Sequence, residues 1–221
     1  MDLNSVAAIA KILGVGMQAY DFINKLGRKQ NESDAISLLC IMYEPTYAWK
    51  SVHLEYCALR HSMKKIYAET HNTNGIAKRV INAQRIQTVF QEPNLYRSVF
   101  HLENDLRVPM EHIDLSFSPR DFNEQMSKIE DVKIRSALER IKNTKNEVVN
   151  THKEVCEFFK NIKDIIDKQR WDDNDVAIVT GARRIYKSEY EAMIDYTDSA
   201  VMGMLDIYEV AFEALSKSNK N

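Results

Sequence analysis

Apolar residues recur at alternating intervals of four and three along the second half of the chain. From residue 134 onward the pattern forms one heptad seam, which consists of Ile134, Leu138, Ile141, Val148, Val155, Phe159, Ile162 and Ile166. Lys145 and His152 are the polar interruptions. Ser118 and Pro119 suit the N-cap and first position of a helix. The pattern therefore predicts one coiled-coil-like helix over about 118–168, roughly 75 Å long, that needs helical partners along its whole seam.

A last amphipathic helix is predicted over about 188–215. Its apolar residues again step by threes and fours, at Ile194, Val201, Met204, Tyr208, Ala211 and Leu215. Residues 119–170 include twelve basic and ten acidic side chains, whereas residues 171–221 include ten acidic and five basic ones. Opposite net charges favour antiparallel pairing of the two helices. We therefore expect a long helical hairpin over 118–221.

The stretch "AAIAKILGVGMQAY", residues 7–20, is almost free of charge. Asp2 does not fit the basic start of a secretory signal, and Lys11 interrupts the apolar run that a signal or a membrane span requires. The two glycines lack the rest of a phosphate-binding loop. We predict a helix over 5–26, capped by Asn4 or Ser5, whose apolar stripe lies in the core.

The same stretch supports an alternative interpretation, a membrane-seeking helix that is held back until a trigger releases it. Its polar face is thin and nearly balanced in charge, unlike the basic face of most membrane-surface helices. The candidate interaction or membrane residues are Ile9, Leu13, Gly16, Met17 and Tyr20.

The middle of the chain also reads as helical. Ser33 is a candidate N-cap for the next helix, which Pro45 is expected to kink or restart. Residues 107–118 are expected to be irregular. We expect a single all-α domain over 1–221, an elongated bundle of about five or six helices. Its N-terminal helices (1–117) and the hairpin (118–221) share one core.

Composition agrees with a helical protein. The chain holds only six Gly and four Pro, fewer turn formers than a sheet-rich fold needs. The net charge of −2 provides no global field to recruit nucleic acid, so we expect no nucleic-acid partner. The three cysteines leave an odd thiol, which indicates a reducing compartment. We expect a cytoplasmic protein, with peripheral membrane binding on activation under the membrane-seeking alternative.

One set of residues has metal-binding chemistry. His53 and Cys57 are four residues apart, and His152 and Cys156 repeat that spacing on the long helix. If the two helices pack antiparallel, two His and two Cys side chains can form a tetrahedral zinc site. The competing interpretation is plain packing, because a buried Cys behaves as a small apolar residue. We expect no cofactor, with zinc as the alternative, and we assign no catalytic residue because no catalytic motif is present.

Residues 5–52 resemble the beginning of HeLo-type helical domains, which are found in cell-death and prion-linked fungal proteins. The resemblance is carried by a small-residue apolar first helix followed by Tyr20-Asp21-Phe22, Gly27-Arg28, Asp34, Leu38, Leu39 and Trp49. It implies a helical bundle whose first helix is released to damage a membrane. Pro45 departs from the family pattern, and no residue after position 52 matches it.

These observations favour a non-enzymatic helical bundle that acts through protein–protein interaction, as a regulatory or scaffold subunit. Its partner is expected to be another protein or a second copy, bound through the long helices. A membrane-active HeLo-like effector is the first alternative, and a metal-binding or enzymatic bundle is the second.

Overall fold

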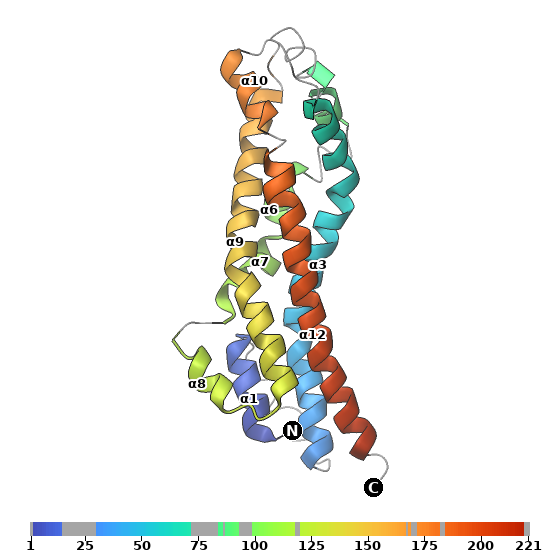
Figure 1. Ribbon diagram of the computed structural model, residues 1–221, viewed down its shortest axis with the longest axis vertical. Coiled ribbons are helices and arrows are strands. Elements are labelled where there is room, and N and C mark those ends of the chain that lie inside the picture. The colour runs from blue at the N-terminus through green and yellow to red at the C-terminus, as the bar shows by residue number, and fades with distance from the viewer. Residues whose placement is uncertain are drawn as a thin grey trace. The chain divides into compact units, whose positions relative to one another are not determined.

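The computed structural model describes residues 2–14, 30–71, 84–85, 87–92, 99–117, 120–166, 168, 172–181 and 184–218. All regular structure within these ranges is helical (Figure 1), so the prediction of an all-α helical bundle is confirmed. The elements are α1 (Leu3–Ile12), α3 (Gln30–His71), α6 (Leu102–Asp105), α7 (Arg107–Leu115), α8 (Phe122–Ser127), α9 (Val132–Ile166), α10 (Asp173–Thr180), the π-helix η1 (Ile185–Tyr190) and α12 (Glu191–Ser218). The described ranges hold more than the expected five or six helices because short helices, such as α6, α8 and α10, lie between the long ones in the sequence.

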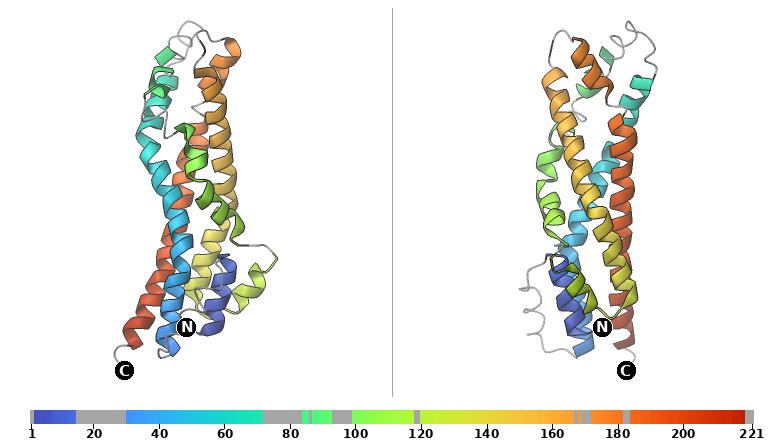
Figure 2. Two further views of the ribbon diagram at one scale, coloured as in Figure 1. Left: turned by 180° about the vertical axis from the view of Figure 1, so that it is seen from behind. Right: turned by 60° about the vertical axis from the view of Figure 1, so that its left-hand side comes forward.

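The described residues cluster into two compact units. The first is drawn from 1–52, 108–147 and 197–221, and the second from 53–107 and 148–196. The helices α3, α9 and α12 contribute residues to both units. Figure 2 shows the same elements from two further sides.

In the first unit, α1 begins earlier and ends earlier than predicted. Asp2 is its N-cap, and the Asp2 carboxylate accepts a hydrogen bond of 2.9 Å from the backbone N–H of Ser5. The helix ends at Ile12 because Gly14 follows with a φ of 70°, the left-handed conformation that terminates helices. The predicted continuous helix over 5–26 is therefore wrong at this point, and residues 15–26 lie outside the described part of the chain.

The helix α3 runs without a break through Pro45. A proline inside a helix removes one backbone hydrogen bond and costs about 3 kcal/mol. Buried side chains on both sides, among them Met42 and Trp49, hold the two flanking segments in one helix. Of the two outcomes expected at Pro45, a kink or a restart, the restart is therefore wrong, because tertiary packing outweighs the local cost.

The segment expected to be irregular forms a helix instead. Helix α7 spans Arg107–Leu115 and buries Met110 and Ile113. Pro109 is tolerated because it lies in the first turn, where backbone N–H groups have no partner within the helix.

The long helix starts later than Ser118, the N-cap predicted for it. Helix α8 ends at Ser127, and α9 begins at Val132, so the predicted single helix over 118–168 is wrong in its first part. Asp131 explains the new start, since its carboxylate accepts a hydrogen bond of 3.1 Å from the N–H of Ile134. Helix α8 packs against α1 instead (Figure 1), and the hydroxyl of Ser5 donates to the carbonyl of Lys128.

The heptad seam of α9 is buried as predicted, from Ile134 to Ile166. Lys145, one of its two polar interruptions, has a specific partner in the first unit. Its ammonium donates to the backbone carbonyls of Asp114 and Ser116, at the C-terminal end of α7. The lysine therefore satisfies carbonyls that have no partner within α7.

In the first unit α9 and α12 pair antiparallel, which confirms the prediction from their opposite charges. Arg140 lies 3.0 Å from Asp206, and Lys133 lies 3.8 Å from Glu213. Gly203 allows the close approach, because a Cβ atom at this position would lie 2.9 Å from Cγ1 of Ile141.

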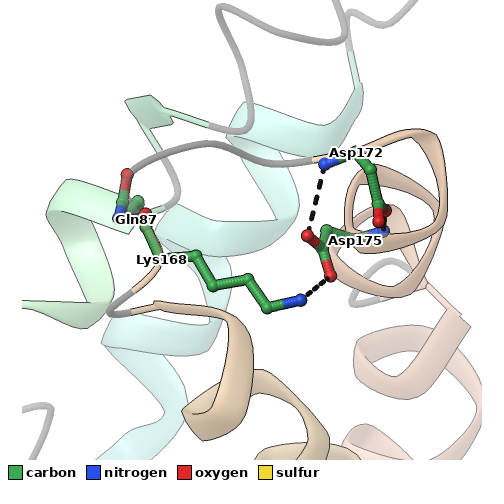
Figure 3. Close-up of polar contacts among 4 residues, drawn as sticks. All are labelled: Gln87, Lys168, Asp172 and Asp175. Carbon is green, nitrogen blue, oxygen red and sulfur yellow. Dashed lines mark hydrogen bonds and ion pairs between the residues drawn. The ribbon is translucent and has the colours of Figure 1, made fainter.

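In the second unit, a polar cluster connects the end of α9 to α10 (Figure 3). The Lys168 ammonium lies 2.7 Å from a carboxylate oxygen of Asp175. Asp172 and Asp175 form a reciprocal capping box at the start of α10. Gln87 donates its side-chain N–H to the carbonyl of Ile166. These contacts link the start of α10 to Lys168 and tie Gln87 to the last residue of α9.

Candidate functional site

The four predicted zinc ligands lie in the second unit as two separate pairs, each on one helix. On α3, Nε2 of His53 lies 3.5 Å from Sγ of Cys57. On α9, Nε2 of His152 lies 3.5 Å from Sγ of Cys156. Within the described ranges no three His, Cys, Asp or Glu side chains are grouped so that they could hold a metal ion. The structure therefore does not gather the predicted ligands into one site.

The reason is that His152 has a different partner. Its Nδ1 lies 3.0 Å from the hydroxyl of Tyr56, on the face of α3 next to that of Cys57. The hydroxyl of Tyr190 donates in turn to the backbone carbonyl of Tyr56, and the two tyrosine rings lie 5.4 Å apart. Tyr56, His152 and Tyr190 therefore form a buried, hydrogen-bonded cluster from three segments of the chain.

Burial keeps the side chains of this cluster, and the neighbouring thiol of Cys156, neutral at ordinary pH. It lowers the pKa of His152 to about 4 and raises the pKa of Cys156 to about 12. Burial also raises the pKa of Tyr56 and of Tyr190. Because metal binding and nucleophilic attack both require a thiolate, the Cys156 thiol is not prepared for either.

Sequence periodicity did not predict the π-helix η1, which supplies Tyr190 of this cluster and the neighbouring Tyr186. Tyr186 and Tyr190 stack with ring centroids 6.0 Å apart, and Tyr186 also lies 5.0 Å from Tyr67 of α3. The Tyr186 hydroxyl donates to Glu191 over 2.9 Å. π-Helical turns are rare and concentrate at functional sites. The local sequence does not predict a π-helical turn, because packing contacts stabilise its wider backbone.

The predicted interaction or membrane residues are only partly described. Ile9 and Leu13 are fully buried in the first unit, and Val6 of α1 is buried with them. Gly16, Met17 and Tyr20 lie outside the described residues. None of the helices in the described ranges has both the length and the apolar content that crossing a membrane requires.

Exposed apolar side chains gather in the first unit. Among the described residues, all but Leu54 of the strongly exposed large apolar side chains belong to it. Three of them lie on α12, where Met202, Leu205 and Phe212 are 48%, 50% and 59% exposed. Because Met204, Ile207 and Ala211 are buried on the other side, α12 is apolar on two faces.

The exposed face of α12 follows heptad spacing. Its members succeed one another at intervals of four and three and are all exposed: Asp198, Met202, Leu205, Glu209 and Phe212. We name this row the α12 stripe. Tyr208 stacks beside it on Phe212, with ring centroids 6.4 Å apart.

A second exposed row lies on α3. It begins with Tyr43 and Tyr47, which are 71% and 63% exposed, and continues through Lys50 to Leu54, again at intervals of four and three. We name this row the α3 stripe. Sequence periodicity did not single out either stripe as exposed, since it cannot show which apolar face of a helix meets the core.

Comparisons of the chain with protein-family models, with curated proteins and with solved structures found no match. The resemblance of residues 5–52 to HeLo-type domains therefore stays a prediction.

Proposed function

We propose that this protein acts by binding another protein through the α12 stripe. The observation that carries the proposal is the exposure of Met202, Leu205 and Phe212 in a helical row. Single exposed apolar residues are ordinary, but a row at 3–4 spacing has the geometry by which a helix receives a partner helix. Exposed apolar rows framed by polar residues are typical of interaction sites.

The energy available from the stripe is moderate. Each of its three apolar side chains is already about half covered, so complete burial contributes roughly 1 kcal/mol per residue. Association itself costs at least about 4 kcal/mol. The stripe therefore serves as the centre of a wider interface, of the order of 800 Å² on each partner.

The membrane-active alternative receives less support from the geometry. Release of α1 would expose the fully buried side chains of Val6, Ile9 and Leu13. At about 1.5–3 kcal/mol each, that loss is comparable with the whole stability of an ordinary domain. A releasing ligand would have to supply this energy.

Site-specific photo-cross-linking in the cells that produce the chain tests the proposal. A photoreactive residue at position 205 should give a protein adduct of discrete mass, and Phe212→Glu should abolish it. The matched control places the same residue at Asn143, an exposed position on α9, where no such adduct is expected. Adducts that form equally at both positions, survive Phe212→Glu, or contain lipid in place of protein contradict the proposal.

A further inference from the structure

Resting on the proposed function, we infer that the partner of the α12 stripe is a second copy of this chain, which docks its α3 stripe there. Both stripes are exposed, and each is a helical row with alternating intervals. The α12 stripe is apolar and acidic, through Asp198 and Glu209. The α3 stripe is aromatic and basic, through Lys50. The chain thus carries both halves of a complementary helix pair.

The charged members of the stripes are available for pairing between copies. No ion pair within the described part of the chain involves Lys50, Asp198 or Glu209. Neighbouring charges on α12 differ in this respect, since Asp206 and Glu213 are paired with α9. Asp198 and Glu209 lie among the exposed apolar residues of the α12 stripe, where a basic side chain of a second copy can form an ion pair with them.

The spacing of the two stripes defines an antiparallel register. On α3 the positions 47, 50 and 54 are separated by three and then four residues. Read backwards, the positions 212, 209 and 205 of α12 are separated by the same steps. Tyr47 of one copy then faces Phe212 of the other, followed by Lys50 facing Glu209. Leu54, one turn further along α3, faces Leu205.

Each layer of this register joins chemically matched side chains. Tyr47 and Phe212 form an aromatic pair, which contributes beyond the apolar area that it buries. Lys50 and Glu209 join opposite charges between two apolar layers, where they fix the register. A register displaced by one heptad places Tyr43 opposite Glu209 and leaves Lys50 opposite Met202, so it loses the charge pair.

The test is a charge exchange in the full-length purified protein, followed by sedimentation over a concentration series. Lys50→Glu and Glu209→Lys should each raise the concentration at which half of the chains are associated, by about 3- to 10-fold. The double variant K50E/E209K should restore the native value. Lys153→Glu and Glu157→Lys, at exposed positions of α9, are the matched controls and should leave association unchanged. Circular dichroism checks that each variant keeps its helix content.

Three results would overturn the inference: a native chain that stays monomeric at its highest soluble concentration, single variants that associate like the native protein, or a double variant that does not recover. The first result, together with a protein adduct of another mass at position 205, removes the second copy but leaves the proposed function intact. If position 205 gives no protein adduct and the purified chain is monomeric, both ideas fail.

Discussion

Protonation of His152 should destabilise the protein as the pH falls. This residue is 8% exposed, and burial lowers its pKa from 6.5 to about 4. The unfolded chain therefore binds this proton at a higher pH than the folded chain does. The stability contributed by the neutral, buried ring is complete above about pH 6.5 and is lost as the pH falls to about 4.

The size of the effect follows from the two pKa values. Each unit of difference corresponds to 1.36 kcal/mol, so the gap between 6.5 and about 4 amounts to about 3 kcal/mol. Because domains of this size are stable by only about 5–15 kcal/mol, the loss should be plain in a denaturation curve.

Urea denaturation at a series of pH values between 7.5 and 4.5 measures the effect. His152→Gln keeps a hydrogen-bonding partner for Tyr56 but does not titrate, so its stability should depend less on pH than that of the native protein. His61→Gln, at an exposed position, is the control and should retain the native dependence. His152 is not the group responsible if His152→Gln leaves the pH dependence unchanged, or if the His152 ring titrates near pH 6.5 in an NMR spectrum of the folded protein.

Four further outcomes are expected. Gly203→Ala should lower the melting temperature, because the new methyl group would clash with Ile141. The clash costs about 1–3 kcal/mol, which outweighs the gain of about 1 kcal/mol in helix propensity. A higher melting temperature would contradict the close approach of the two helices. Val155→Asp places an unpaired charge at a fully buried seam position and should cost several kcal/mol; an unchanged melt would remove Val155 from the core. Lys168→Met should raise the pKa of Asp175, because the hydrogen bond from Lys168 lowers it. The variant should lose more stability at neutral than at acidic pH, since the Asp175 contribution is present above about pH 3.8 and is lost below it. Equal losses at both pH values in urea melts would count against the ion pair. Metal analysis of the purified protein should find far less than one zinc ion per chain, because its two His–Cys pairs are not gathered into one site; a stoichiometric amount whose removal lowers stability would overturn that reading.

The sequence predicted the buried seam of α9 because periodicity reports which residues share a face. The sequence did not predict the start of α9, because a single capping hydrogen bond sets it, from the N–H of Ile134 to the carboxylate of Asp131. The polar seam positions Lys145 and His152 looked like defects in the pattern. Each meets a partner that is distant in sequence, which no local rule can supply.

Pro45 and α7 show the opposite limit. Local rules treat proline as a helix breaker, yet α3 continues through Pro45 and α7 contains Pro109. Packing around Met42 and Trp49 decides the first case, and position in the first turn decides the second. The same holds for the candidate site. The His–Cys spacing correctly predicted that each pair lies on one face of a helix. The contact of Tyr56 with His152 could not be predicted, because it depends on how three segments pack together.

The π-helix η1 changes how the heptads of this chain should be counted. Its hydrogen bonds reach one residue further than those of an α-helix, so this segment holds an extra residue for the same advance along the axis. Since each residue of an α-helix turns the chain by about 100°, a register counted backwards from α12 through 185–190 assigns the first residues of η1 to the wrong face of the helix. An alignment of related chains should therefore place a one-residue gap at η1, not in a loop. Deleting one residue there would rotate Tyr186 away from Tyr67 while leaving the α12 stripe in phase.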